Sequence, residues 1–234
     1  MGEHGPVIPD DISGPMTGSM TGSATAAAAS RPQARTPVEE PPVGEQVVLL
    51  DEAGRSVGTA DKWQVHHATT PLHLAFSCYL FDHDGGLLTT RRATVKKTWP
   101  GVWTNTCCGH PLPGEPLTHA VRRRLHHELG LAAVDGLTLV LPGFRYRATM
   151  ADGIVENELC PVFIARTGDA PRPRADEVDD VEWVPWDRFA ESVLHGGRDI
   201  APWCRLQVAE LDRLGPDPLG WPAADPALLP PAAR

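Results

Sequence analysis

The chain has 234 residues and a formal net charge of −9, with five cysteines. The acidic balance argues against a general nucleic-acid or membrane-surface binder, and the odd cysteine count offers no disulfide framework, which favours a reducing, cytoplasmic compartment. No apolar run approaches the roughly 20 residues that span a bilayer, and the N-terminus lacks the basic region and apolar core of a secretory signal.

The first part of the chain combines a tail with the start of a folded domain. Residues 1–44 are rich in Gly, Pro, Ser, Thr and Ala without periodic order, which predicts a disordered leader. The apolar run 47–50 predicts a short strand, and 72–81 predicts a longer one. The turn sequence Asp82-His-Asp-Gly-Gly86 then reverses the chain, so 87–90 is expected to pair back as a hairpin.

The rest of the chain mixes helices and strands. A helix is predicted over 116–129, because Pro116 stands at its first turn and Gly130 lies just beyond its end. Strands are also expected over 137–149, 154–166 and 182–184, and helices over 186–194 and 203–214. This order lacks a regular βαβ alternation, so it predicts a single α+β domain on a mixed sheet over 45–215, followed by a flexible Pro- and Ala-rich tail over 216–234.

The predicted helix 116–129 carries two charges on its apolar side. At about 100° per residue, Arg124 and Glu128 project into the apolar stripe of the helix. Charges that point inward are costly unless they are paired or used. Two explanations remain open: a buried i, i+4 ion pair, or the floor of a pocket that holds a metal and an anion. The second is favoured by the other polar residues described below.

Carboxylates and imidazoles suggest a metal site. Glu156 and Glu158 face the same way on a predicted strand with apolar neighbours, and they repel unless a cation lies between them. A Glu-x-Glu pattern alone is more often a solvated face, but surplus histidines favour metal ligation. His66 and His73 are candidate ligands, although spacing alone does not select His66 over His67.

Four segments together carry a family resemblance. They are Trp99-Pro-Gly-Val-Trp-Thr-Asn-Thr-Cys-Cys-Gly-His-Pro111, Phe144-Arg-Tyr-Arg-Ala148, Val155-Glu-Asn-Glu158 and Leu72-His-Leu-Ala-Phe76. In this order they resemble type I isopentenyl-diphosphate isomerases, which are metal-dependent enzymes with a Nudix fold. The resemblance covers about residues 46–210. It implies a Nudix-like mixed β-sheet sandwiched by helices, and the interconversion of isopentenyl and dimethylallyl diphosphate in isoprenoid biosynthesis.

The resemblance also separates the chain from Nudix hydrolases. The hydrolase signature places Glu six residues after a Gly, as Glu115 follows Gly109 here, and then requires further glutamates that gather metal for attack by water. Arg124 and His127 stand at two of those glutamate positions. A Nudix hydrolase of a diphosphate substrate therefore remains only the alternative function.

Metal ligands are the first set of roles that the resemblance implies. One divalent metal (Mn²⁺, Zn²⁺ or Mg²⁺) is expected to be held by His66, His73, His110, Glu156 and Glu158. Imidazole ligands favour the softer ions. A second ion, Mg²⁺, is expected to bridge to the substrate diphosphate through Glu128 and the backbone carbonyl of Cys108.

Catalytic and substrate-binding residues form the second set. Cys108 and Glu158 are expected to be the catalytic pair, and Tyr146 to assist Glu158. The residues expected to contact the isoprenoid diphosphate are Lys62, Arg92, Lys96 and Arg124 for the diphosphate and Trp203 for the isoprenoid carbons.

The sequence leaves several points open. Proton addition and removal on opposite sides of an allylic unit suit one carboxyl and one thiol, and Glu158 is favoured as the acid and Cys108 as the base, without excluding the reverse. The adjacent Cys107 is expected to point away from the site as a small buried residue. The alternative outside the enzymes is a domain that binds a metal or a partner protein and catalyses no reaction. We expect a monomer without nucleic-acid partners.

Overall fold

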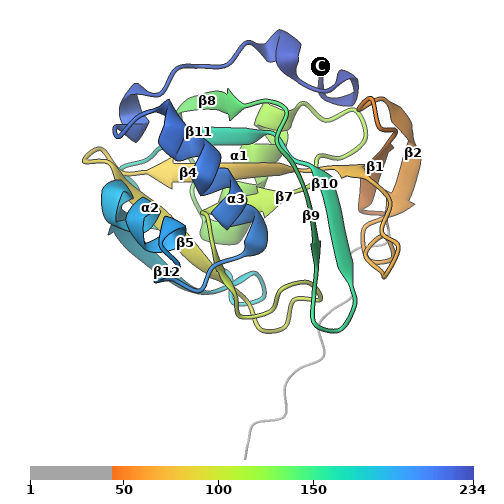
Figure 1. Ribbon diagram of the computed structural model, residues 1–234, viewed down its shortest axis with the longest axis horizontal. Helices are drawn as coiled ribbons and strands as arrows, with labels where there is room; N and C mark the ends of the chain where they lie inside the picture. The colour runs from red at the N-terminus through yellow and green to blue at the C-terminus, as the bar shows by residue number, and fades with distance from the viewer. Residues whose placement is uncertain (1–43) are drawn as a thin grey trace, which may run out of the picture. The chain divides into compact units, whose positions relative to one another are not determined.

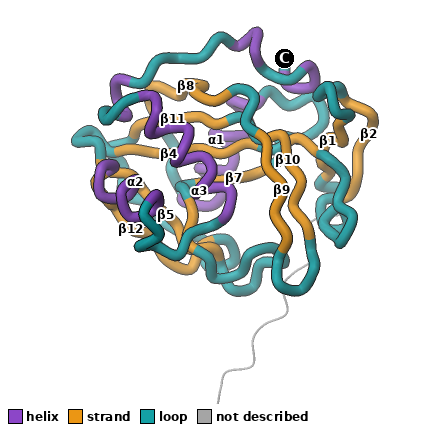
Figure 2. The backbone as a smooth tube through the Cα atoms, in the orientation of Figure 1, coloured by secondary structure: helices purple, strands orange, loops and turns teal. Residues whose placement is uncertain are grey.

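The computed structural model describes residues 44–234, so the expected leader lies outside the described residues apart from its last position. Two sheets make up the framework (Figures 1 and 2). The first runs in the order β2 (Ser56–Asp61), β1 (Gln46–Leu50), β3 (His73–Leu74), β10 (Val155–Leu159) and β9 (Arg145–Thr149). The second runs β12 (Val178–Pro185), β5 (Gly86–Arg92), β4 (Phe76–Phe81), β11 (Val162–Arg166) and β8 (Asp135–Leu141). The short strands β6 (Trp103–Thr104) and β7 (Cys107–Gly109) pair with β5 and β4.

The three long strands expected from sequence are each divided between the two sheets. The run 72–81 forms β3 and β4, 137–149 forms β8 and β9, and 154–166 forms β10 and β11. The last two divide at Pro142 and Pro161, because proline cannot donate to a ladder. Residues next to these divisions therefore lie where the two sheets meet.

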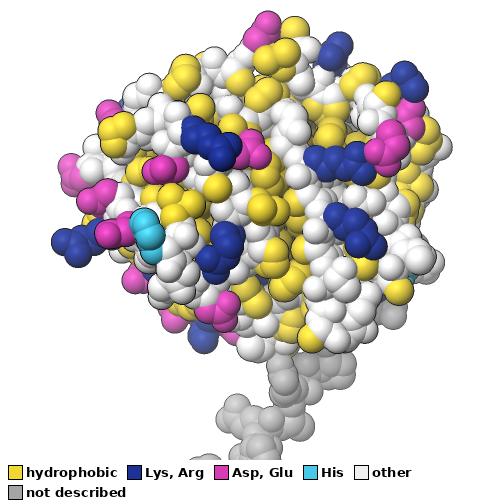
Figure 3. All heavy atoms as spheres, viewed as in Figure 1, with side chains coloured by type: hydrophobic (Ala, Val, Ile, Leu, Met, Phe, Trp, Pro, Cys, Tyr) yellow, Lys and Arg dark blue, Asp and Glu magenta, His cyan; other side chains and the backbone are white. Residues whose placement is uncertain are grey.

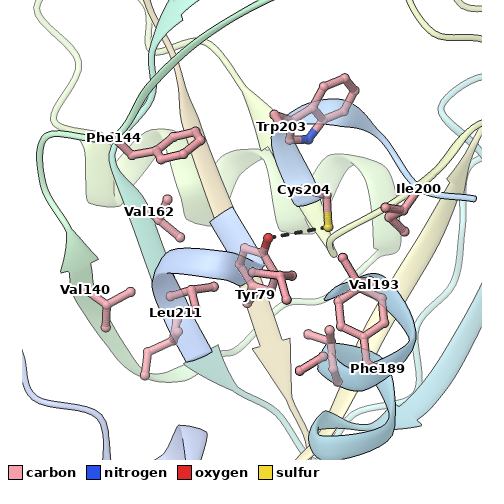
Figure 4. Close-up of a cluster of buried hydrophobic side chains, with 14 of the residues drawn as sticks. Tyr79, Val140, Phe144, Val162, Phe189, Val193, Ile200, Trp203, Cys204 and Leu211 are labelled. Atoms are coloured by element: carbon pink, nitrogen blue, oxygen red, sulfur yellow. Dashed lines mark hydrogen bonds between the residues drawn. The ribbon is translucent and has the colours of Figure 1, made fainter. Parts of the chain in front are cut away.

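Helices cover both faces of the second sheet. Alternate residues of β4 point to opposite sides: Phe76, Cys78 and Leu80 pack with α1 (Leu117–Leu129), whereas Tyr79 and Phe81 pack with two later helices. Those helices are α2 (Trp186–Leu194) and α3 (Pro202–Leu211). Figure 4 shows side chains of both helices gathered around Tyr79. The prediction of a mixed sheet sandwiched by helices is confirmed.

The helix α1 follows its expected bounds closely. It has no side-chain cap at Pro116, and it ends at Gly130, whose φ of 66° is left-handed and whose N–H donates to the carbonyl of His126. The helix lies close to β7, because a Cβ added to Gly109 of that strand would lie 3.0 Å from Cγ of Arg124 in the helix. Glycine at this position therefore permits the close approach of helix and strand.

The C-terminal segment 216–234 packs on the domain, which differs from the flexible tail that its composition predicts. It contains three short turns, η2 (Pro218–Gly220), η3 (Pro226–Leu228) and η4 (Pro231–Ala233), after η1 (Asp212–Leu214) has ended α3. Trp221 is buried against Phe81 and Trp186, with ring centroids 6.0 and 4.9 Å away. The burial of one large aromatic ring explains why a segment of low sequence complexity is held in place.

The strand β2 was absent from the sequence prediction. Most of its residues are exposed, so it shows no alternation of apolar and polar side chains. Within residues 44–234, no helix is both long and apolar enough to cross a membrane. On the face of the domain viewed in Figure 3, charged side chains of both signs are interspersed with apolar ones.

Candidate active site

Three histidines converge on one carboxylate oxygen. The Nε2 atoms of His66, His73 and His110 lie 4.0, 3.4 and 3.1 Å from Oε1 of Glu158. His73 and Glu158 are direct neighbours in the parallel pairing of β3 with β10, while His110 follows β7. All four potential ligand atoms lie within 4.8 Å of one another. The structure thus brings together four of the five residues expected at the first metal.

The donor chemistry of this group fits a divalent cation. Nε2 of His66 is buried without a hydrogen-bond partner, and the Nε2 atoms of His73 and His110 approach to 3.2 Å. Nδ1 of His73 lies 3.0 Å from the carbonyl oxygen of Pro71, which orients that ring as second partners of metal-bound histidines do. Nitrogen and carboxylate ligands of this kind suit Zn²⁺ or Mn²⁺.

Electrostatics favour the cation-binding forms of His110 and Glu158, whereas Glu158 raises the pKa of His73 against the opposing effect of burial. Burial, together with the neighbouring His73 and His66, lowers the pKa of His110 to about 3 although Glu158 opposes this. Burial alone would raise the pKa of Glu158, but interactions with the nearby imidazoles of His110, His66 and His73 bring it well below its ordinary value. A neutral imidazole and an ionised carboxylate are therefore both present near neutral pH.

Glu156 lies beside this group rather than in it. Its Oε2 accepts a 2.9 Å hydrogen bond from the hydroxyl of Tyr146, which is also 2.9 Å from Oε2 of Glu158. Both glutamates are 5% exposed, so this Glu-x-Glu strand is not a solvated face. Burial and repulsion by Glu158 raise the pKa of Glu156.

Cys108 occupies the neighbouring strand β7. Its Sγ lies 3.2 Å from Oδ1 of Asn105 and 3.2 Å from Oγ of Ser77. Burial raises the pKa of the Cys108 thiol to about 11, against the opposing effect of these hydrogen bonds. Cys107 points away, into the apolar cluster that contains α1, as expected from strand alternation.

Trp203 forms an aromatic wall beside the thiol. Its Nε1 donates to Oδ1 of Asn105 over 3.1 Å, and its ring lies 5.8 Å from the ring of Tyr146. The guanidinium carbon of Arg92 lies 5.7 Å from the same indole ring. Figure 4 shows the indole at the start of α3, next to Cys204.

The cationic residues are paired with protein partners. Nε and Nη2 of Arg124 donate to Oε1 of Glu128 over 2.9 and 2.6 Å, so the buried i, i+4 ion pair is present. Nη2 of Arg124 also contacts Glu177, which forms an ion pair with Lys96 as well. Elsewhere, Nζ of Lys62 lies 3.0 Å from Oε2 of Glu45, and Arg92 donates to the backbone carbonyl of Thr98.

Glu177 was not predicted as a site residue from the sequence. It lies in the acidic run 176–180, which has the composition of a solvated turn and carries no periodic signal. Burial would raise the pKa of its carboxyl, but the charges of Lys96 and Arg124 lower it far below the ordinary value of 4.5. Ser77 in β4 and Asn105 in the bend between β6 and β7 were missed as well, because a single small polar residue in a strand or bend has no sequence signature of its own.

Comparisons with known proteins show the family of the chain. Residues 71–204 match the NUDIX domain. The chain is 61% identical to "Isopentenyl-diphosphate Delta-isomerase" of Saccharopolyspora erythraea over 189 residues, which cover 81% of this chain and 97% of that protein. It is 58% identical to the protein of the same name from Mycolicibacterium vanbaalenii over 171 residues, covering 73% and 93%. Among solved structures, DR0079 from Deinococcus radiodurans has a TM-score of 0.56 at 16% identity, covers 71% of this chain and 98% of its own, and supports the fold alone.

Proposed function

The chain belongs to the isopentenyl-diphosphate Delta-isomerases of the Nudix fold, and we propose that it moves the substrate double bond with Glu158 and Cys108 as its two proton-transfer groups. The isomerase interconverts isopentenyl and dimethylallyl diphosphate. What supports the proposal is the joint presence of a largely buried His-Glu cluster and the partly buried thiol of Cys108 beside one aromatic wall.

The first metal site in this proposal uses the histidine cluster. His66, His73, His110 and Glu158 would hold one divalent ion, with Glu156 adjacent through Tyr146. Mn²⁺, Zn²⁺ and Mg²⁺ are the candidate ions, and imidazole favours the first two. When bound, such an ion supplies a fixed positive charge beside the carboxylates.

The proton transfers follow from the chemistry of an unactivated alkene. A proton added at the terminal carbon of the double bond leaves a tertiary carbocation. Loss of a proton from the methylene carbon on the other side of the cationic carbon gives the product. For the forward direction we assign proton donation to Glu158 in its protonated form and proton removal to Cys108 in its thiolate form, which are the less populated forms of both groups at neutral pH. The indole of Trp203 can stabilise the cation without trapping it, and its burial helps to exclude water.

The diphosphate would bind to cations that now contact protein carboxylates or, for Arg92, the backbone carbonyl of Thr98. Arg92, Lys96 and Arg124 can grip or neutralise phosphate oxygens, with Lys62 as a further contact. Both bonds from Arg124 go to Oε1 of Glu128, so Oε2 of Glu128 can join a substrate-bound Mg²⁺. Binding of the diphosphate to Lys96 or Arg124 is expected to rearrange their ion pairs with Glu177.

The proposed catalytic thiol also bears on the cellular compartment of the enzyme. All five cysteines are free thiols, one of them catalytic in this proposal. We place the enzyme in the reducing cytoplasm, where such a thiol persists, and we propose that it acts as a monomer.

The test is proton NMR of isopentenyl diphosphate with the purified protein and Mg²⁺ in D₂O. Dimethylallyl diphosphate with incorporated deuterium is the expected product, and Cys108→Ala should form none. Turnover by Cys108→Ala at the rate of the wild type would remove the thiol from the mechanism. Free phosphate as the main product would favour the hydrolase alternative.

A further inference from the structure

Two hydrogen-bonded bridges connect α3 to the thiol of Cys108. Trp203 and Gln207 are four residues apart, so they lie on the same side of the helix. Nε1 of Trp203 donates to Asn105, and Nε2 of Gln207 donates to Oγ of Ser77 over 2.9 Å. Asn105 and Ser77 both contact Sγ of Cys108 over 3.2 Å. The sulfur is therefore held from two sides.

The surrounding groups fix the direction of the bond between Asn105 and Cys108, and Oγ of Ser77 also lies 3.3 Å from Sγ of Cys160, a second thiol that can donate to it. Nδ2 of Asn105 donates to the backbone carbonyls of Cys78 and Cys107, so its Oδ1 is an acceptor and receives the proton of the Cys108 thiol. With that proton committed, Cys108 Sγ can accept the proton of Ser77. Oγ of Ser77 in turn accepts from Gln207.

The second bridge is anchored behind the site. The hydroxyl of Tyr79 donates to Oε1 of Gln207 over 3.0 Å, which fixes the orientation of the amide. Ser77, Asn105 and Gln207 are all 0% exposed. A helix can be packed on a sheet by aliphatic side chains alone, and buried polar groups are costly unless fully bonded. In this network, by contrast, three buried polar side chains are arranged around one sulfur atom.

We propose that Ser77 and Gln207 are positioning residues that hold the sulfur of Cys108 in place for proton transfer. The inference rests on the catalytic role of Cys108 proposed above. Ser77 is paired with Cys108 across β4 and β7, so its hydroxyl has a fixed place relative to the sulfur. As the thiolate, Cys108 can accept the substrate proton while Ser77 continues to donate to the sulfur, and the thiol that results then donates to Oδ1 of Asn105. Misplacement by a fraction of an ångström would slow the transfer.

The experiment compares Ser77→Ala, Gln207→Met and the double variant as full-length, metal-loaded enzyme with isopentenyl diphosphate. Each single variant should lower kcat about tenfold while KM stays within about twofold of wild type, because the diphosphate contacts lie on other residues. The double variant should be no slower than the slower single variant, since the two side chains act as one bridge. Bound metal, measured by elemental analysis, should equal that of the wild type.

Val208→Ala is the matched control. Val208 is fully buried on the same helix, and its truncation should lower the melting temperature without a fall in kcat. If Gln207→Met does not fold, Ser77→Ala decides alone, since it removes one oxygen and leaves α3 intact. Unchanged kcat in the single variants, or multiplying losses in the double variant, would overturn the inference while an inactive Cys108→Ala left the proposed function standing. An active Cys108→Ala would instead overturn the proposed function.

Discussion

At the scale of single residues, the site depends on groups whose environment fixes their charge. Neutral His110 and ionised Glu158 are suited to a cation, and the unpartnered Nε2 of His66 is aimed at the same place. Sequence could nominate these residues through a family motif, but spacing alone could not choose His66 over its neighbour. Only the fold brings their nitrogens to one oxygen atom.

His110→Ala is expected to weaken binding of the first metal by more than the roughly 100-fold seen when a supporting residue is lost, because it removes a direct ligand. Titration of Zn²⁺ or Mn²⁺ into metal-free protein, followed by calorimetry, measures the effect. His119→Ala, an exposed histidine of α1, serves as the control and should bind metal like the wild type. Equal affinities in the two variants would contradict the assigned site.

Glu177 carries a prediction about pH. Its lowered pKa means that the ionised carboxylate stabilises the folded state at neutral pH, and that this contribution is lost as the pH falls through the folded-state pKa. Glu177→Gln should therefore lower the free energy of unfolding at pH 7 by about 2 kcal/mol. Urea titrations should show the gap to wild type narrowing below pH 4.5, the ordinary value for this carboxyl. A gap that does not change with pH would contradict the ion-pair explanation.

At the scale of elements, the sequence predicted which helices and strands are present better than it predicted where each one begins and ends. The helix 116–129 was recovered almost residue for residue, because proline and glycine mark its ends. The long strands were predicted as continuous, because apolar patterning does not reveal that a strand passes from one sheet to another. The prolines at 142 and 161 were the available signal for two of the three divisions.

Gly109→Ala tests the approach of α1 to β7. The new Cβ would lie 3.0 Å from Arg124 and 3.2 Å from Phe76, so the helix must shift and stability should fall by about 1–3 kcal/mol. We expect kcat to fall too, since Cys108 is adjacent. Gly143→Ala is the control, because nothing lies within 4 Å of a Cβ at that position. Thermal unfolding of both variants gives the comparison, and equal melting temperatures would refute the steric argument.

At the scale of the whole molecule, the described domain extends to the last residue of the chain. The backbone N–H of Ala224 donates to Leu139, and that of Ala232 donates to Gly54, so the segment 216–234 spans the second sheet and the turn before β2. Composition alone could not predict this, because proline and alanine give no periodic signal.

Removal of residues 216–234 should therefore destabilise the domain. Loss of the buried Trp221 alone is expected to cost about 3–5 kcal/mol, so Trp221→Ala should show most of the effect of the truncation. Differential scanning calorimetry of the two variants measures it. A truncated protein with the wild-type melting temperature would contradict this packing and support the flexible tail that the sequence predicts.

The parallel pairing of β3 with β10 has a consequence for folding. His73 and Glu158 belong to strands separated by nearly half of the described sequence, and β4 and β11 continue the same two strands into the other sheet. Non-local pairings of this kind form slowly, after local hairpins and helices. The complete metal-binding group can therefore exist only once both sheets have assembled, which makes metal capture a late event and a direct kinetic marker of finished folding.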